Sequence, residues 1–270
     1  MGDVNRTVTV FGLGEAGSLI AADLAGAGAV VRGYDPADVA TPQGVERYGD
    51  PKTAVLGSDL VMAITAAVDA QAAMAQAWDV IGRGTVYADL STAPPSLKED
   101  LNDTATLRGL RFADVALMAP VPGRGLATPS YASGAGAVSY SEAVNSFGAQ
   151  VEVVGDAAGT AATRKLIRSV FMKGLTAVLI EATRTAEAAG EGVWFWEHVA
   201  DVVGDADEEL LVRMVSSTAT HSTRRREEME AATQLLEILG VDPVMTRSTV
   251  ESLRRIPEEG VPAVGGDSVP

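Results

Sequence analysis

A glycine-rich turn between two short apolar runs constrains the start of this chain more than any other feature. Residues 7–11 read TVTVF, an apolar run typical of a buried strand, and lead directly into Gly12-Leu13-Gly14-Glu15-Ala16-Gly17. A helical stretch follows, and a second apolar run over 29–34 ends in Asp35. This order of strand, glycine turn, helix, strand and acid is the fingerprint of a dinucleotide-binding βαβ unit. The alternative interpretation is a simple strand-to-helix turn in a buried unit.

Each part of the motif has a physical role in that interpretation. Gly12 allows the tight turn, Gly14 lets a pyrophosphate approach the main chain, and Gly17 lets the helix pack closely on the sheet. The free N–H groups and positive dipole end of the helix favour phosphate binding. The carboxylate of Asp35 can accept hydrogen bonds from ribose hydroxyls and would repel a 2′-phosphate, which favours NAD over NADP.

The pattern of apolar residues predicts two domains. Strand-like and helix-like segments alternate up to residue 157, which predicts a Rossmann-type, doubly wound, mostly parallel sheet covered on both faces. The strands expected after Asp35 cover 59–65, 85–89, 111–117, 134–138 and 151–154, and the helices 69–78, 96–104 and 143–148. From 158 to 256 the pattern is almost wholly helical, with helices expected over 161–189, 194–203, 208–217, 223–239 and 245–256. We expect this second domain to serve substrate binding and dimerisation, and the Gly- and Pro-rich residues 257–270 to be disordered.

The segment 161–189 is unusually apolar for a single helix. Its apolar residues cover most of the helix circumference, so the helix must be buried on several sides. One small helical domain does not readily cover that much surface. The sequence therefore predicts a homodimer in which this helix packs on the partner's helical domain.

Composition excludes several classes of function. The chain has 36 acidic and 21 basic residues, a formal net charge of −15, which argues against nucleic acid or an anionic membrane as a partner. It has no cysteine and two histidines, His198 and His221, so disulfides and thiolate catalysis are excluded and we expect no metal site. No signal-peptide pattern opens the chain, and no apolar run of about 18 residues predicts a membrane span. We therefore expect a soluble cytoplasmic protein.

Three motifs together resemble a known family. The first is the glycine turn at 12–17, the second is Asp89-Leu90-Ser91-Thr92-Ala93-Pro94-Pro95, and the third runs from Gly159 to Ser169 and contains Lys165. They resemble, in order, the GLGxMG, DxSTxxP and GxGxxxKxxxN elements of β-hydroxyacid dehydrogenases in the 6-phosphogluconate dehydrogenase superfamily. The resemblance covers nearly the whole chain, and the helical half is most similar to a little-characterised branch.

The resemblance implies an oxidoreductase that transfers a hydride between NAD or NADP and a small hydroxyacid, with Lys165 as the general acid and base. It implies a set of candidate cofactor-binding residues: Gly12, Leu13, Gly14, Glu15, Ala16, Asp35, Thr65, Ala66, Ser91 and Thr92. The candidate substrate-binding residues are Pro122, Gly123, Arg124, Ser169, Lys173, His221 and Arg225. We expect the substrate to be small and anionic.

The chain departs from the family pattern around the expected substrate. The family's second glycine is Ala161 here, and its asparagine is Ser169. The family's DAPVSGG loop corresponds to residues 118–124, which places Met118 at its aspartate and Pro122 at its substrate-binding serine. The resemblance therefore implies the fold, the cofactor and the lysine, but not the identity of the substrate.

The candidate catalytic residues have plausible chemistry and ordinary alternatives. A desolvated lysine can accept and return the proton of an alcohol, and Ser169 and Lys173 can share one helical face with Lys165. The alternative is a solvated helix edge. Arg124 suits bidentate carboxylate recognition, or is a surface arginine. His221 and Arg225 complete an anion pocket, or belong to a salt-bridged helix face.

Two other functions stay open at this point. One is an imine reductase, which shares the architecture and reduces C=N bonds, although such enzymes commonly lack a lysine at the position of Lys165. The other is a nucleotide-binding protein without catalysis, which the proline at 122 in place of the family's serine keeps possible.

Overall fold

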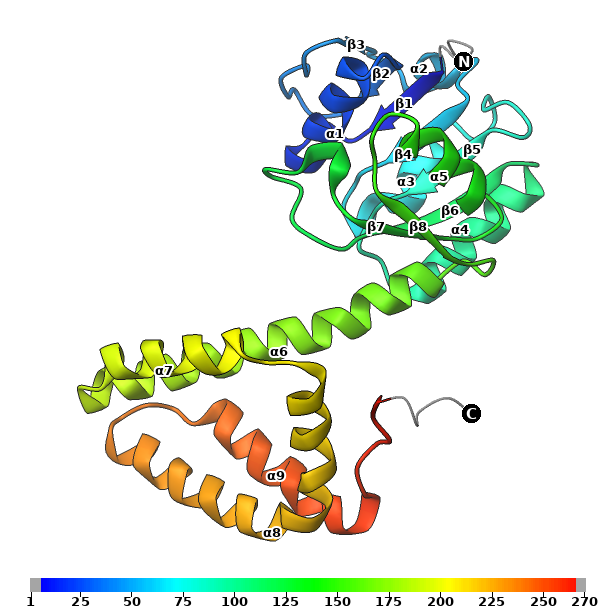
Figure 1. Ribbon diagram of the computed structural model, residues 1–270. Coiled ribbons are helices and arrows are strands. Elements are labelled where there is room, and N and C mark those ends of the chain that lie inside the picture. The colour runs from blue at the N-terminus through cyan, green and yellow to red at the C-terminus, as the bar shows by residue number, and fades with distance from the viewer. Residues whose placement is uncertain (1–5, 266–270) are drawn as a thin grey trace. The chain divides into compact units, whose positions relative to one another are not determined.

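The computed structural model describes residues 6–265, and these residues form two compact parts that meet between Arg168 and Ser169. The first part is an α/β domain and the second is all helical (Figure 1). Helix α6 (Thr160–Ala189) contributes to both parts, so the division falls within this helix rather than before it. The predicted fold class, a Rossmann-type sheet followed by an all-α region, is confirmed.

The first part is built on an eight-stranded sheet with the strand order β3-β2-β1-β4-β5-β6-β7-β8. Its strands are β1 (Thr7–Phe11), β2 (Val30–Tyr34), β3 (Val45–Arg47), β4 (Leu60–Ala63), β5 (Val86–Asp89), β6 (Arg111–Leu117), β7 (Ser130–Ser133) and β8 (Val151–Gly155). All neighbouring strands are parallel except β6 and β7, which are antiparallel. The chain order reverses beside β1, and such a switch point is where open α/β sheets bind ligands, at the carboxyl ends of the strands.

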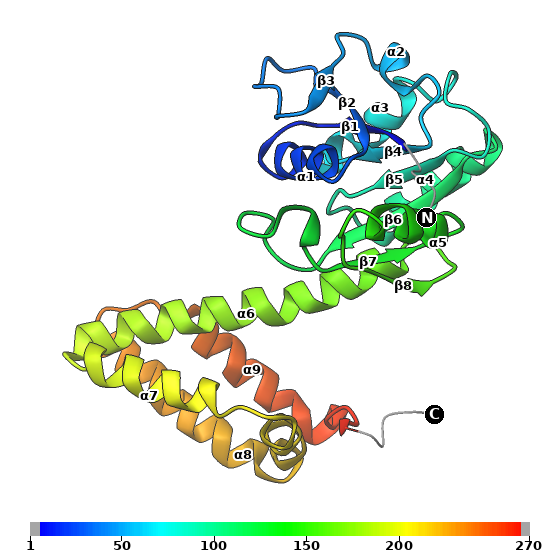
Figure 2. The same cartoon turned by 45° about the horizontal axis from the view of Figure 1, so that its top comes forward.

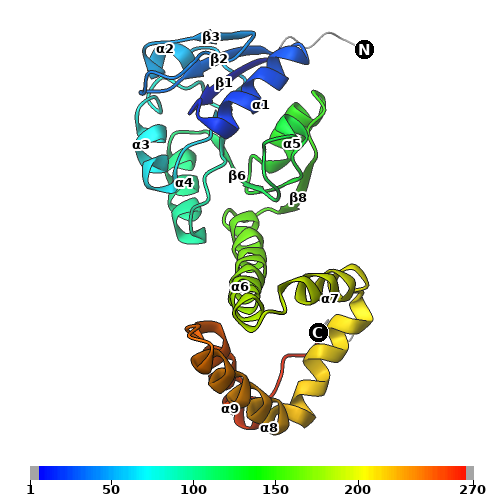
Figure 3. The same cartoon turned by 90° about the vertical axis from the view of Figure 1, so that its left-hand side faces the viewer.

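Helices cover both faces of this sheet (Figure 3). On one face, α1 (Glu15–Gly26) and α5 (Ala137–Asn145) bury side chains such as Leu24 and Tyr140 against the strands. On the other face, α2 (Pro51–Val55), α3 (Ala70–Ala75) and α4 (Pro95–Leu107) bury side chains such as Met74 and Leu101. Because both faces are buried, the central strands are continuous apolar runs, which is why the sequence pattern revealed them.

The strand predicted over 134–138 is wrong. The strand is β7, at Ser130–Ser133, and α5 already begins at Ala137 and ends at Asn145 instead of covering 143–148. Gly134 has a φ of +98°, and a Cβ there would lie 2.9 Å from the Phe112 carbonyl oxygen. The chain therefore turns at Gly134 instead of extending. The short elements β3 and α2 were not predicted either.

The second part consists of the rest of α6 together with α7 (Gly192–Gly204), α8 (Glu208–Ile238) and α9 (Val244–Glu259). Helix α8 ends before Gly240, whose φ of +74° is typical of the residue that follows a helix C-cap. Helix α9 continues through Pro257 to Glu259, so the first residues of the expected disordered tail are helical. The end of that tail, 266–270, lies outside the described residues.

Helix α8 is continuous where two helices, 208–217 and 223–239, were expected, but it bends in the region between them (Figure 1). The Arg225 guanidinium donates to the Met214 carbonyl oxygen at 3.2 Å and to the Ser217 hydroxyl at 2.8 Å. In a straight helix, residues 214 and 225 would be about 16 Å apart along the axis, beyond the reach of an arginine. Hydroxyls that bond back to carbonyls one turn earlier, as Ser217 and Thr218 do, favour such a bend.

A buried carboxylate caps helix α9. Glu181 of α6 is 8% exposed, and it accepts hydrogen bonds from the N–H groups of Met245 at 2.7 Å and Thr246 at 2.8 Å, and from the Thr246 hydroxyl at 2.6 Å. Burial alone would raise the pKa of this carboxyl, but the hydrogen bonds from Thr246 and from the N–H groups of Val244, Met245 and Thr246 outweigh burial and lower it. The ionised form of Glu181 therefore stabilises the contact between α6 and α9.

We expect Glu181→Gln to reduce the free energy of unfolding by about 2 kcal/mol at pH 7, because it removes charge-assisted hydrogen bonds to a buried helix end. The pKa of Glu181 is lowered on folding, so its stabilisation is complete above its ordinary pKa of 4.5 and is lost as the pH falls through the folded value. Urea unfolding at pH 7 and at successively lower pH measures both effects. The matched control is Glu187→Gln, an exposed position of α6. Equal stabilities for both variants at pH 7 would contradict the capping role.

Candidate functional site

The glycine turn has the geometry that a dinucleotide requires. Gly12 has a φ of +88°, and a Cβ there would lie 2.3 Å from the Ile64 carbonyl oxygen. A Cβ on Gly17 would lie 1.9 Å from the Gly12 carbonyl oxygen, so helix α1 packs directly on the turn. A Cβ on Gly14 would have no atom within 4 Å. The space beside Gly14 is therefore available to a ligand, whereas Gly12 and Gly17 are required by packing.

Asp35, at the end of β2, is fixed in place by main-chain donors. Its carboxylate accepts a hydrogen bond from the Leu13 N–H at 2.7 Å and from the Ala37 N–H at 2.9 Å. It therefore connects the glycine turn with the loop after β2. A carboxylate offers about four acceptor positions, so two donors leave capacity for ribose hydroxyls.

Two arginines near this loop bind main-chain oxygens. The Arg32 guanidinium donates to the Leu56 carbonyl at 2.6 Å, and the Arg47 guanidinium donates to the carbonyls of Asp35 at 2.7 Å and Ala37 at 2.9 Å. Arg47 thus orders the loop that contains Asp35. Both guanidinium groups therefore have main-chain partners around this loop.

A cleft of about 300 Å³ lies at the carboxyl ends of β1, β2 and β4. It is lined by Phe11, Gly12, Gly14, Tyr34, Asp35, Pro36, Ile64, Thr65, Ala66, Asp69, Ala72, Ala73 and Gln76. Five of the predicted cofactor residues are among them. The Thr65 hydroxyl and the Gln76 side-chain oxygen are buried without a hydrogen-bond partner, which is rare in folded proteins. A ligand with polar groups would satisfy them, so the cleft fits a nicotinamide dinucleotide.

The other predicted cofactor residues do not line this cleft. Leu13 is buried and binds Asp35 through its N–H, while Glu15 and Ala16 begin helix α1. Ser91 is buried after β5, and its hydroxyl donates to Asp89 at 2.6 Å, whereas Thr92 is exposed. Asp69 and Gln76 line the cleft but were not among the predicted residues. Their spacing at i and i+7 in a helix-like segment that follows a buried strand was the available signal.

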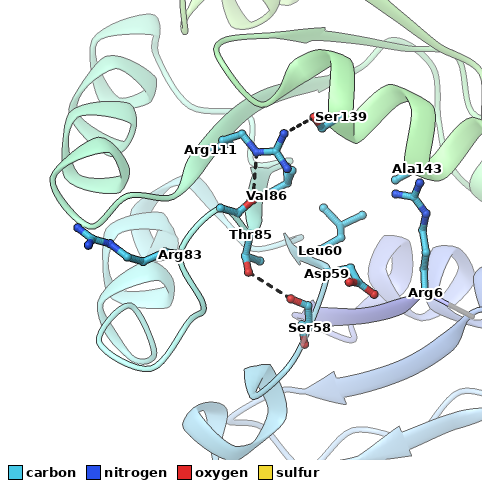
Figure 4. Close-up of a pocket in the computed structure, with 11 residues that line it drawn as sticks. Arg6, Ser58, Asp59, Leu60, Arg83, Thr85, Val86, Arg111, Ser139 and Ala143 are labelled. Atoms are coloured by element: carbon cyan, nitrogen blue, oxygen red, sulfur yellow. Dashed lines mark hydrogen bonds between the residues drawn. The ribbon is translucent and has the colours of Figure 1, made fainter.

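A second hollow, of about 320 Å³, lies at the opposite edge of the sheet (Figure 4). Arg6, Asp59 and Arg111 are among the residues that line it, at the amino ends of β1, β4 and β6. The Arg111 guanidinium donates to the Gly84 carbonyl at 3.0 Å and to the Ser139 hydroxyl at 2.7 Å, which ties β6 to its neighbours. Ligands of open α/β sheets bind at the carboxyl ends, so this hollow is not the cofactor site.

The start of helix α6, which contains Lys165, is anchored to the sheet. Asp114 of β6 accepts hydrogen bonds from the N–H groups of Gly159 at 3.1 Å and Ala162 at 3.0 Å. A carboxylate at a helix N-terminus is favourable for both hydrogen bonding and the helix dipole. Lys165 is half-buried, three residues beyond Ala162, and belongs to the same compact part as the cleft.

The predicted substrate residues are distributed over several elements. Ser169 and Lys173 follow Lys165 at i+4 and i+8 on the continuous helix α6, and both belong to the second part, as do His221 and Arg225 of α8. His221 is exposed in the middle of α8, whereas it was expected between the helices 208–217 and 223–239. The guanidinium of Arg225 is engaged within its own helix.

The loop that contains Pro122, Gly123 and Arg124 is exposed and follows β6. It packs on helix α1 through η2 (Gly125–Ala127), as Figure 2 shows. Asp23 of α1 accepts a hydrogen bond from the Leu126 N–H at 2.8 Å. The expected substrate loop is thus attached to the helix that begins at the glycine turn.

Within residues 6–265, no cluster of three or more histidine and acidic side chains is arranged to hold a metal ion. Over the same range, no helix is both long and apolar enough to span a lipid bilayer.

The strand order, the glycine turn and the cleft define a dinucleotide-binding protein of the Rossmann class. Residues 7–155 match the family model of the NAD-binding domain of 6-phosphogluconate dehydrogenase, and residues 186–256 match a domain of unknown function, DUF1932. The first match covers more than half of the chain. The protein therefore belongs to the family with the 6-phosphogluconate dehydrogenase NAD-binding domain.

Three individual proteins illustrate what the chain is similar to. An uncharacterised 28.5 kDa protein of Methanothermus fervidus is 26% identical over 220 residues, which cover 82% of this chain and 84% of that one. A conserved hypothetical protein of Sinorhizobium meliloti is 29% identical, with a TM-score of 0.62 over 96% of this chain and 92% of that one. An imine reductase of Myxococcus stipitatus, solved with NADP⁺, is 19% identical, with a TM-score of 0.79 over 94% and 95%. At that identity, the likeness to the imine reductase shows the fold alone.

Proposed function

We propose that this protein is an NAD(P)-dependent oxidoreductase that transfers a hydride between the cofactor and a small hydroxyacid, with Lys165 as general acid and base. The observation that carries the proposal is the position of Lys165 on a helix whose first turn is fixed to the sheet by Asp114. That helix start and the cofactor cleft belong to one compact part.

The proposed chemistry divides between cofactor and protein. A bound nicotinamide supplies the hydride acceptor or donor. The Lys165 amine takes the proton from the substrate hydroxyl during oxidation and returns it during reduction, so that proton and hydride transfer are matched. Arg124, on the exposed loop after β6, is proposed to bind the substrate carboxylate through its fork of N–H donors. Ser169, Lys173 and His221 remain candidates for further substrate contacts.

An imine reductase is the second candidate, supported by the fold shared with the Myxococcus stipitatus enzyme. A panel of small 3-hydroxyacids, with NAD⁺ and NADP⁺, and of cyclic imines, with NADH and NADPH, separates the alternatives by absorbance at the nicotinamide band. Oxidation of a hydroxyacid supports the first proposal, and reduction of an imine alone supports the second. Cofactor binding without turnover of any compound would favour a nucleotide-binding protein that performs no chemistry.

Asp35 bears on the choice between NAD and NADP. We expect NADH to bind more tightly than NADPH, because the Asp35 carboxylate would repel a 2′-phosphate. Two unit charges 4 Å apart in water interact by about 1 kcal/mol, so the preference should be at least about fivefold. Asp35→Ala and Asp35→Asn should both reduce this preference for NADH. Asp38→Ala, at an exposed position in the same loop, should leave the preference unchanged. Fluorescence titration with both cofactors measures this, and tighter NADPH binding by the unaltered protein contradicts it.

Exposed apolar side chains on helices α6 and α7 bear on the oligomeric state. Helix α6 exposes Val170 (77%) and Phe171 (60%), and helix α7 exposes Trp194 (58%) and Trp196 (53%), which is more large apolar surface than a soluble monomer usually leaves uncovered. We propose that a second copy of this chain covers it. Light scattering should give twice the chain mass of 27.8 kDa, and Phe171→Glu should shift the mass toward the monomer.

The matched control for this prediction is Leu107→Glu, because Leu107 of α4 is 84% exposed and lies in the other part of the chain. It should leave the mass unchanged. A monomer mass for the unaltered protein at micromolar concentration rules out the proposed dimer.

A further inference from the structure

A lysine and two aspartates form a fully buried cluster beneath the carboxyl edge of the sheet. Lys98 of α4, Asp89 of β5 and Asp114 of β6 are each 0% exposed. The Lys98 ammonium lies 2.5 Å from one Asp89 carboxylate oxygen and 3.3 Å from one Asp114 carboxylate oxygen. It also donates to the Asp89 main-chain carbonyl at 2.9 Å. This cluster could not be predicted, because Lys98 lies in a polar helix segment.

Burying three charged groups costs free energy, so the cluster is expected to do more than fill space. Asp89 and Asp114 are register partners on adjacent parallel strands, which places two like charges side by side. Lys98 provides the cation between them, but a well-packed apolar set at such a position is often equally or more stable than buried charges. The two segments that the cluster connects, the loop after β5 and the first turn of α6, therefore indicate its role.

On one side, the cluster fixes the loop after β5. The Ser91 hydroxyl donates to the same Asp89 oxygen that Lys98 contacts, at 2.6 Å. Since Lys98 also binds the Asp89 main-chain carbonyl, both the side chain and the backbone at the end of β5 are held. Ser91 and Thr92 in this loop are proposed cofactor contacts.

On the other side, the cluster fixes the first turn of α6. The second oxygen of Asp114 accepts from the N–H groups of Gly159 and Ala162, and from the Ser133 hydroxyl at 3.1 Å. The Ser133 hydroxyl in turn accepts from the Ala161 N–H at 3.0 Å. Two carboxylates and one ammonium have a formal net charge of −1, which the positive end of the α6 dipole complements.

We propose that Lys98 is a positioning residue that holds the loop at Ser91 and the first turn of α6 in a fixed relation. Its ammonium is the group that joins the two halves of the network, since Asp89 holds one segment and Asp114 the other. Lys98 touches neither cofactor nor substrate in this proposal. Its role for catalysis rests on the proposed function, because it acts through Ser91 on the cofactor and through α6 on Lys165.

A single and a double variant distinguish the loss of charge balance in the cluster from the loss of positioning. Lys98→Met removes the ammonium and leaves two buried carboxylates, so we expect a large loss of stability. The double variant Lys98→Met/Asp89→Asn restores the net charge of the cluster and keeps an acceptor for Ser91, so its thermal unfolding midpoint should recover most of the loss. The matched control is Lys52→Met/Asp79→Asn, which removes an exposed ion pair of 2.6 Å.

Hydrogen–deuterium exchange tests positioning separately, because amide exchange rates would not change if Lys98 only balanced the charge of the cluster. In the double variant, amides in residues 88–93 and in 157–163 should both exchange at least about tenfold faster than in the unaltered protein, although stability has recovered. The control variant should leave both segments unchanged. Native exchange in either segment of the double variant would overturn the proposal, because Lys98 would then only neutralise charge or serve one side alone.

NADH titration of the same variants provides the functional readout. The double variant should bind NADH at least about tenfold more weakly, since displacing a binding group by about 1 Å is enough for such losses. Unchanged NADH affinity in the double variant would count against positioning of the Ser91 loop. Failure of the unaltered protein to bind NADH would instead refute the proposed function, and the exchange measurement would still decide whether Lys98 couples the two segments.

Discussion

Replacing Lys165 with methionine is expected to reduce turnover by about 10²- to 10⁴-fold, the usual contribution of a general acid or base. Affinity for NADH should stay unchanged, because the cleft is lined by residues between Phe11 and Gln76 and Lys165 is not among them. Methionine keeps the apolar stem of the lysine and removes the ammonium, so packing at the start of α6 is disturbed little. Steady-state kinetics on the best hydroxyacid of the panel, with parallel NADH titration, measures both quantities.

The matched control is Arg168→Met, which removes a cation from an exposed position on the same helix. It should retain most of the activity. If Lys165→Met retains most of its activity on the true substrate, the assignment is wrong, and Lys173 or His221 becomes the candidate. If Lys165→Met also loses NADH affinity, the lysine contacts the cofactor or supports the fold instead.

The second large effect is expected at the glycine turn, where two substitutions should fail for different reasons. Gly17→Ala should reduce the free energy of unfolding by about 3 kcal/mol or more, because its Cβ would lie 1.9 Å from the Gly12 carbonyl oxygen and helix α1 would have to move. Gly14→Ala should leave stability unchanged, because nothing lies within 4 Å of its Cβ. It should nevertheless weaken NADH binding at least about tenfold, because the methyl group occupies the approach of the pyrophosphate.

Urea unfolding and NADH titration of both variants distinguish these effects. Gly26→Ala is the control, since it lies at the end of the same helix with nothing within 4 Å of its Cβ and should leave NADH affinity intact. Full NADH affinity in Gly14→Ala would show that the phosphates do not bind beside this residue, and the assignment of the cleft would have to be revised.

The parts of the fold that could be predicted are those whose information is local in the sequence. The glycine turn, helix α1 and strand β2 follow one another within about 30 residues, and their apolar runs are continuous because both faces of the sheet are covered. Lys165 could be proposed because residues 159–169 resemble the lysine element of the family. Whether it takes part in catalysis is a prediction that the experiments above test.

The parts that could not be predicted depend on contacts between polar groups. Strand β7 is polar at both ends, and Ser133 can be buried there only because Asp114 and the Ala161 N–H supply its partners. The bend of α8 contains neither Gly nor Pro, and depends on hydroxyls and on Arg225. The Lys98 cluster joins three elements that are separated in sequence. In each case the decisive contact is a hydrogen bond or ion pair between polar groups, which hydrophobic periodicity does not reveal.

The attachment of the loop after β6 to helix α1 limits how this scaffold can be re-engineered. Gly125 has a φ of +52°, and a Cβ there would lie 1.8 Å from an Asp23 carboxylate oxygen, the same oxygen that accepts from the Leu126 N–H. A loop transplanted from a relative therefore needs a glycine at the position of 125 and an N–H donor one residue later, or a compensating change at Asp23. Libraries that diversify Pro122 to Arg124 alone avoid this constraint, whereas those that extend to residue 126 have to vary helix α1 with them.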